Sequence, residues 1–175
     1  VAITGDLVDG SVNRLREHME PLAQLRAKHG VYFVTGNHEY YSGADAWCEH
    51  LRQLGIRVLR NEHVAIDHAD GSGFDLAGVD DWNAFGPGHG PQLVRALEGR
   101  DREREVVLLA HQPRQVAEAA DAVPREDAAH WGWSASDWSH EVAEAFGHQQ
   151  LCDTRGFGGK AEGDVKPRVA GAGWV

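Results

Sequence analysis

Three apolar runs of this sequence lead directly into side chains that can bind metals or transfer protons. This pattern constrains the fold more than any other feature. Such runs are typical of buried strands, and polar groups at the ends of strands commonly form one site. We therefore expect one site at one edge of a sheet. The three runs with their following residues are 31–34 (VYFV) before 35–41 (TGNHEYY), 1–3 (VAI) before 4–10 (TGDLVDG), and 106–110 (VVLLA) before 111–113 (HQP).

The overall charge favours a protein that tolerates cations and argues against a nucleic-acid-binding surface. The 175 residues include 27 acidic and 17 basic side chains, a net charge of -10, whereas phosphate backbones require clustered Lys and Arg. The two cysteines are too few for a disulfide scaffold or a cysteine zinc cluster. No apolar run approaches the roughly 20 residues of a membrane helix, and no signal peptide is visible. The chain begins at Val1 within a predicted strand, which indicates a piece of a longer protein.

Strands and helices alternate up to about residue 121, which predicts an α/β domain. Pro21 lies inside the first predicted helix, where we expect a bend. Predicted helices cover 12–29, 45–54, 92–97 and 114–120, and predicted strands cover 1–4, 31–35, 56–59, 64–66, 74–79 and 106–110.

The composition changes after residue 121. Leu occurs there once, Ile is absent, and four of the six Trp lie in this part. One helix is predicted, over 139–146. The tail is either a divergent end or the product of a shifted reading frame, and its composition favours the second. We therefore expect a domain at 1–121 and an atypical tail at 122–175 that is poorly ordered or not native to the fold.

The side chains at the strand ends suit a metal site. The carboxylate of Asp6 can bridge two cations, while Asn37 and His111 offer an amide oxygen and an imidazole nitrogen. This mixture favours Mn, Fe, Zn or Co over Ca. His38 is placed to donate a proton to a leaving oxygen, and Asp9 is the expected partner of its other ring nitrogen. Two ions there would bind a phosphate and activate water.

Each residue also has a simpler interpretation. Asp6 and Asp9 are ordinary turn residues when considered alone, and a single histidine such as His111 is more often structural than metal-binding. Asn37 and His38 could form a turn with positive φ at Asn37. The occurrence of all five after strands favours the site.

The motifs resemble those of the calcineurin-like metallophosphoesterases. Residues 5–9 match GDxxD, residues 36–39 match GNH[DE], and residues 109–111 match the later single-histidine motif. The resemblance covers about residues 1–121. In detail, residues 4–10 and 36–43 are similar to those of a bacterial phosphodiesterase branch with many membrane-tethered members. Gly10 and Ser11 replace the arginine that follows GDxxD in the protein-phosphatase branch, which disfavours phosphoprotein substrates.

The resemblance implies a fold, a site and an activity. The implied fold is a β-sandwich flanked by helices, a four-layer αββα arrangement that is incomplete in this chain. Asp6 would bridge two divalent metals, Asn37 and His111 would bind one of them, and His38 with Asp9 would handle the leaving group, while Glu39 is expected to be structural. The implied activity is hydrolysis of small phosphoesters by a metal-bound hydroxide. The parent protein would be cytoplasmic or membrane-associated.

Two motifs of that family are not found. Its opening D-x-H motif would precede this chain, and no G-H-x-H motif follows His111. His130 and His148 are weak substitutes, since Gln150 occupies the position of the second histidine. A different interpretation is therefore a non-catalytic remnant that binds at most one cation weakly. A phosphate-binding module is disfavoured because no glycine-rich phosphate loop is present. Residues 80–82 and the 83–91 loop are candidates to shape the substrate pocket.

Overall fold

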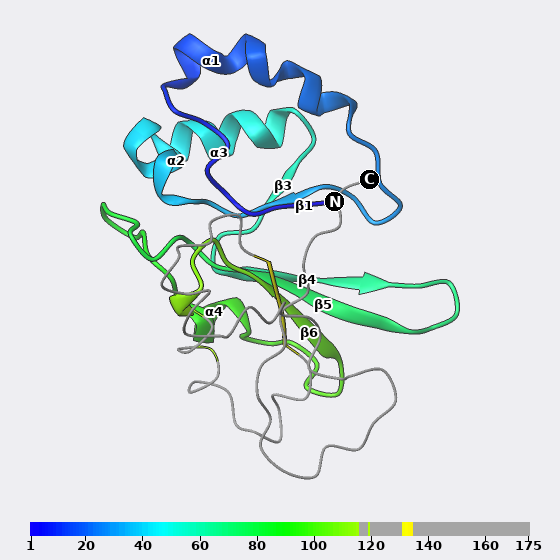
Figure 1. Ribbon diagram of the computed structural model, residues 1–175. Coiled ribbons are helices and arrows are strands. Elements are labelled where there is room, and N and C mark those ends of the chain that lie inside the picture. The colour runs from blue at the N-terminus through cyan, green and yellow to red at the C-terminus, as the bar shows by residue number, and fades with distance from the viewer. Residues whose placement is uncertain (116–118, 120–130, 135–175) are drawn as a thin grey trace, which may run out of the picture.

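A computed structural model describes residues 1–115, 119 and 131–134 of the chain. Two sheets are stacked, with helices outside each of them (Figure 1). The first sheet is made of β1 (Ala2–Ile3), β2 (Tyr32–Phe33) and β3 (Arg57–Val58), and the second of β4 (Glu62–Asp67), β5 (Gly73–Gly78), β6 (Glu105–Leu109) and β7 (Trp131–Ser134). The helical segments are α1 (Val12–Met19), the 3-10 helix η1 (Glu20–Gln24), α2 (Asn37–Ser42), α3 (Ala44–Gln53) and α4 (Leu93–Ala96).

The first sheet is entirely parallel, in the order β1-β2-β3. The second has the order β4-β5-β6-β7, in which only the β4–β5 pair is antiparallel. A short turn joins β4 to β5, as a hairpin requires, whereas the parallel pairs are joined by longer crossovers. Parallel pairing brings the carboxyl ends of β1 and β2 together, and this places the two main sequence motifs side by side.

Three separate hydrophobic layers hold the elements together. In Figure 1, α1, α2 and α3 lie over the first sheet, and α4 lies beyond the second. The sequence of layers confirms the predicted αββα sandwich. The layer between α3 and the first sheet includes Phe33, Cys48, Leu51 and Val58; the layer between the sheets includes Tyr32, Val34, Leu59, Leu76 and Leu109; the layer against α4 includes Ala77, Val79, Ala96, Val106 and Leu108.

The run that contains β2 shows why these strands are continuously apolar. Phe33 contributes to the layer under the helices, while Tyr32 and Val34 contribute to the layer between the sheets. Alternate side chains of a strand point to opposite faces. Both faces are covered here, so polar alternation is absent from the sequence.

Several predicted elements have different bounds in the structure. The predicted helix 12–29 ends at Gln24, and its second part is a 3-10 helix with Pro21 near its start. Ser11 is the N-cap of α1, but its side chain makes no capping hydrogen bond. Asp45 lies in the first turn of α3 rather than before it. The predicted strand 56–59 is reduced to the two residues of β3.

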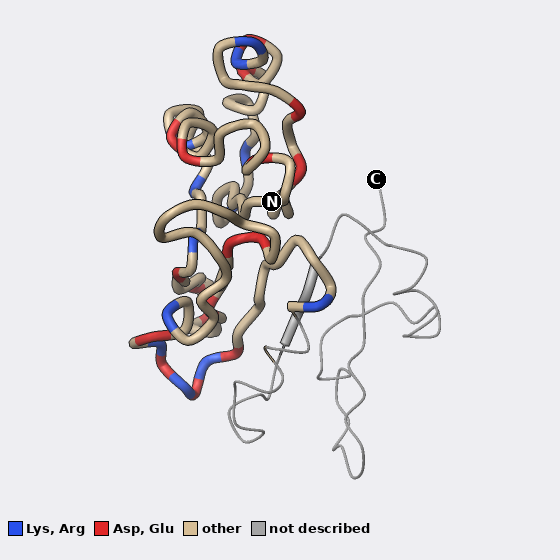
Figure 2. Tube along the Cα trace, turned by 90° about the vertical axis from the view of Figure 1, so that its left-hand side faces the viewer, with Lys and Arg blue, Asp and Glu red and all other residues tan. Residues whose placement is uncertain are grey.

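Acidic and basic residues are interspersed along the described trace (Figure 2). No helix within the described ranges has the length and apolar character needed to cross a membrane. Most of the predicted tail, including the 139–146 helix, lies outside these ranges. The boundary near residue 121 therefore stays a prediction, although β7 pairs with β6 in parallel.

Candidate functional site

The ends of β1 and β2 approach each other so closely that only glycines fit between them. A Cβ added to Gly5 would lie 2.6 Å from the Cα of Gly36, and one added to Gly36 would lie 2.5 Å from the backbone nitrogen of Asp6. Gly5 and Asp6 both have positive φ, at 93° and 54°. Such backbone is easy for glycine and unusual for aspartate. The turn therefore directs the Asp6 carboxylate toward the end of β2.

The turn after β2 is a helix and not the loop that the sequence suggested. α2 begins at Asn37, the predicted metal ligand, and Glu39 accepts a hydrogen bond of 2.6 Å from the backbone N–H of Gly36. This is the carboxylate half of a capping box. Gly43, with a φ of 96°, ends the helix in the left-handed conformation.

The buried carboxylate of Glu39 ties the two motifs together. It also accepts hydrogen bonds from the backbone N–H groups of Asp6, at 2.9 Å, and Leu7, at 2.7 Å. Glu39 is fully buried, and burial raises the pKa of its carboxyl group while the three amide donors lower it. The contacts agree with the structural role expected for this residue.

His38 lies between the two predicted aspartates. Its backbone N–H donates to Asp6 Oδ1 at 3.0 Å, and its ring nitrogen Nδ1 pairs with Asp9 Oδ1. The other ring nitrogen, Nε2, lies 3.8 Å from Asp6 Oδ2. The hydrogen bond to Asp9 raises the pKa of His38. The ring thus has a fixed orientation, with Nε2 on the side of Asp6.

His111 reaches the same carboxylate from the other sheet. It follows β6, is 1% exposed, and places Nε2 3.2 Å from Asp6 Oδ2. Its Nδ1 lies 2.7 Å from the carbonyl oxygen of Thr4, which can only accept. The expectation of one edge of one sheet is therefore wrong. The site is formed where the ends of β1 and β2 meet the end of β6 across the sandwich.

The donor chemistry around Asp6 suits a cation, but only in part. Nδ1 of His111 faces the carbonyl of Thr4 and Nε2 faces the Asp6 carboxylate, so Nε2 is the ring nitrogen that a cation held by Asp6 could meet. Asn37, which precedes His38 in the sequence, carries an amide oxygen that could add a third donor. Within the described residues, however, no three His, Cys, Asp or Glu side chains are grouped closely enough to hold a metal.

Two buried carboxylates, those of Asp80 and Asp81, follow the end of β5. From the sequence they were expected only to shape the substrate pocket. Asp81 is fully buried, and its Oδ1 accepts from Gln112 Nε2 at 3.2 Å, whereas its Oδ2 has no hydrogen-bond partner. Burial raises the pKa of Asp81, and the nearby ring of His111 lowers it. Gln112 follows His111 directly, so Asp81 borders the site from β5.

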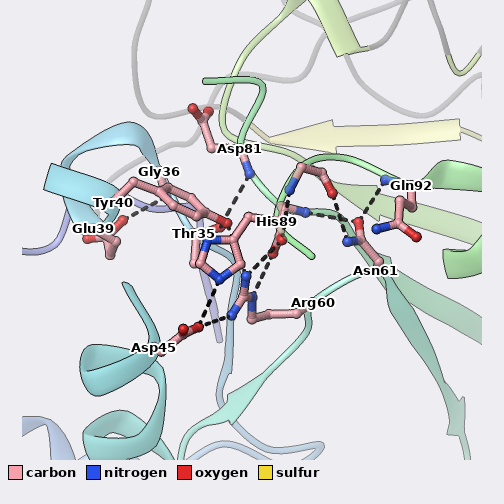
Figure 3. A network of polar contacts seen from close by, with 12 residues as sticks. Thr35, Gly36, Glu39, Tyr40, Asp45, Arg60, Asn61, Asp81, His89 and Gln92 are labelled. Carbon is pink, nitrogen blue, oxygen red and sulfur yellow. Dashed lines mark hydrogen bonds and ion pairs between the residues drawn. The ribbon is translucent and has the colours of Figure 1, made fainter. Parts of the chain in front are cut away.

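A polar network behind the site joins both sheets (Figure 3). Arg60 donates to both carboxylate oxygens of Asp80, at 2.8 and 2.9 Å, and to Asp45 on α3 at 2.7 Å. This pairing raises the pKa of Arg60 and lowers that of Asp45. The Arg60–Asp80 pair could not be predicted from local sequence patterns, because the two residues are 20 positions apart.

The chain belongs to the calcineurin-like phosphoesterase family, whose sequence model matches residues 1–150. The fold and the order of the strand-end motifs agree with this membership. The match extends beyond residue 121, where the motif resemblance ended. No solved structure was found to match the chain.

Curated relatives carry names that agree with the family. A transmembrane protein with metallophosphoesterase domain from Danio rerio is 41% identical over 130 residues, covering 71% of this chain and 30% of that protein. A protein of the same name from Bos taurus is 44% identical over 131 residues, covering 70% and 30%. An uncharacterized metallophosphoesterase from Helicobacter pylori is 38% identical over 117 residues, covering 66% and 30%. The chain spans less than a third of the length of these relatives.

Proposed function

We propose that this chain carries part of the active site of a metal-dependent phosphoester hydrolase with a dinuclear centre. The substrate class is a small phosphodiester or pyrophosphate. One observation supports this most strongly: Asp6 lies beside the oriented ring of His38, and His111 contacts it from the second sheet. Asp6, Asn37 and His111 would hold divalent ions such as Mn, Fe, Zn or Co.

The protein's own groups would divide the work as follows. When bound, the ions would neutralise phosphoryl oxygens and lower the pKa of water. His38 would protonate the leaving oxygen through Nε2, since Nδ1 is engaged by Asp9. Asp9 would hold the ring and favour its protonated form. Glu39 would keep Asp6 and Gly36 at the spacing that the site requires.

The second candidate is a non-catalytic remnant that binds one cation weakly. It is favoured because, among the described residues, no three His, Cys, Asp or Glu side chains are arranged so that they could hold a metal ion. The two candidates differ in what they require from outside this chain. A hydrolase needs further metal ligands from outside this chain to complete the centre, whereas a remnant needs no further ligands.

Hydrolysis of bis(p-nitrophenyl) phosphate with added Mn²⁺ tests the proposal. It would be measured for this chain and for a chain extended at both ends, with Mn²⁺ binding followed by calorimetry. We expect turnover by the extended chain and a loss of about 100-fold or more in His111→Ala, since a catalytic metal contributes several kcal/mol. His18→Ala, which removes an exposed histidine on α1, serves as the control. Activity in the short chain would reject the remnant. If both chains lack turnover and also fail to bind Mn²⁺, the hydrolase is rejected.

We also propose that the whole protein is associated with a membrane. The support is indirect, since two relatives are named transmembrane proteins. Fractionation of cells that express the whole protein tests this: recovery in the washed membrane pellet is expected, and full recovery in the supernatant would contradict it.

A further inference from the structure

Two exposed aromatic rings lie next to His38. Tyr41, near the end of α2, is 65% exposed, and Phe85, in the segment after β5, is 56% exposed. The two rings are stacked, with centroids 6.1 Å apart and planes inclined by 27°. Tyr41 also meets the ring of His38 edge to face, at 5.8 Å and 61°. The surface formed by Tyr41 and Phe85, here called the aromatic rim, therefore begins at the group assigned to the leaving oxygen.

The aromatic rim is supported by buried contacts behind it. The ring of Tyr40, only 5% exposed, packs against Phe85 at 6.0 Å and His89 at 5.3 Å. The segment that carries Phe85 is fixed at His89, whose Nδ1 lies 2.7 Å from the carbonyl oxygen of Phe85 and whose Nε2 lies 3.1 Å from Asp45 on α3. Figure 3 shows His89 between Tyr40 and Asp45. The rings are thus held in place before a ligand arrives, which lowers the entropic cost of binding.

The charges around the aromatic rim limit what can bind there. Asp9 and Asp45 are its carboxylate neighbours, with side chains 83% and 72% exposed. Arg60 is linked to this border through Asp45, and its guanidinium is already paired with Asp45 and Asp80. Anionic groups such as lipid headgroups are repelled by exposed carboxylates. An anionic leaving group is therefore disfavoured at the aromatic rim.

We propose that the aromatic rim binds a planar, uncharged aromatic ring on the leaving group of the phosphoester. This inference rests on the proposed function, because it uses His38 as the donor to the leaving oxygen. A ring one or two bonds from that oxygen would reach Tyr41, whose contact with His38 fixes the direction. The near-parallel faces of Tyr41 and Phe85 allow a third ring to extend the stack, a geometry that aromatic pairs prefer.

The test compares two substrates that differ only in the ring. Benzyl methyl phosphate and cyclohexylmethyl methyl phosphate release alcohols of similar size and basicity, and the ring alcohol is quantified by chromatography. Aromatic contacts beyond simple burial contribute about 2- to 12-fold. We expect kcat/KM to favour the benzyl substrate by that factor, and the preference to fall to about 1 in Tyr41→Leu/Phe85→Leu. Tyr41→Phe keeps the ring and should keep the preference, as should Val94→Ala, which removes an exposed side chain of α4.

A binding measurement separates failure of this inference from failure of the proposed function. Methyl 2-phenylethylphosphonate and methyl 2-cyclohexylethylphosphonate attach the ring-bearing arm through carbon, so the arm cannot leave. Calorimetry with Mn²⁺ present should show tighter binding of the phenyl compound, lost in the double variant. If there is no turnover but the phenyl compound still binds more tightly, the hydrolase is rejected, whereas the inference that the aromatic rim binds an aromatic ring stands. Equal affinity for the two phosphonates, or a preference unchanged in the double variant, would overturn the inference.

Discussion

Gly36 packs directly against Asp6, and a single added methyl group would separate them. A Cβ on Gly36 would lie 2.5 Å from the backbone nitrogen of Asp6 and also overlap its carboxylate. The backbone nitrogen cannot rotate away as a side chain could, so the two strand ends would have to move. The relationship explains why a glycine precedes Asn37 and makes the geometry of the site sensitive to this position.

Gly36→Ala is therefore expected to reduce both stability and metal binding. Overpacking of this kind costs about 1–3 kcal/mol, and displacement of Asp6 should weaken Mn²⁺ binding. Urea unfolding and calorimetry measure the two effects. Gly10→Ala is the control, because its Cβ would meet only the side chain of Leu15, at 3.1 Å. Equal unfolding midpoints for Gly36→Ala and the parent chain would contradict the prediction.

Glu39→Ala is expected to destabilise the fold more than an ordinary surface change. It would leave the backbone N–H groups of Asp6, Leu7 and Gly36 without their acceptor. An unsatisfied buried donor costs about 1–3 kcal/mol, and water entering the space would offset part of the total. Glu49→Ala removes an exposed acceptor on α3 and should change the free energy of unfolding by less than about 0.5 kcal/mol. Similar losses for the two variants would show that the hydrogen bonds accepted by Glu39 do not stabilise the fold.

His38→Ala is expected to affect substrates according to their leaving groups. General acid catalysis contributes about 100- to 10,000-fold, but p-nitrophenolate leaves without a proton. The loss in kcat should thus be large for benzyl methyl phosphate and small for methyl p-nitrophenyl phosphate. Asp9→Asn should act in the same direction to a smaller extent, since it alters only the partner of Nδ1. Equal losses on both substrates would argue against proton donation by His38.

The strand-end residues could be predicted from the sequence because their signals are local. Asp6 and His38 each follow an apolar run within a few positions, and the structure brings both together with Asp9. The sequence could not show that His111 arrives from a second sheet, since an apolar run does not reveal which sheet it joins. The helical start at Asn37 is also hard to predict, because its N-cap is Gly36, which has no side chain, and the capping carboxylate belongs to Glu39.

Long-range polar contacts are the second part that the sequence could not reveal. Arg60 meets Asp80 across 20 positions, and His111 meets the carbonyl of Thr4 across 107. Such contacts leave no period in the sequence, and charged residues are most often solvated. They become visible only after the sheets are stacked.

Arg60→Met is expected to destabilise the fold strongly. Its partner Asp80 is 1% exposed, and removing one member of a buried ion pair costs about 3–5 kcal/mol. The side chain of Arg60 is 18% exposed, so a value near the lower limit is expected. Arg60→Met/Asp80→Leu should recover part of this loss, because no buried charge is left unpaired. The free energy of unfolding would be measured for both single variants and the double variant. If the loss in the double variant equals the sum of the losses in Arg60→Met and Asp80→Leu, the pair is not coupled.

Cys48 is expected to resist thiol reagents in the folded protein. It is 1% exposed in the layer between α3 and the first sheet, and burial raises the pKa of its thiol to about 11. The thiolate is the reactive form, and a thiol with a pKa of about 11 is almost entirely protonated at pH 8. Reaction with a disulfide reagent should therefore follow unfolding. Cys152→Ser removes the second thiol, and rapid labelling of that variant at pH 8 without urea would show that Cys48 is not enclosed in this layer.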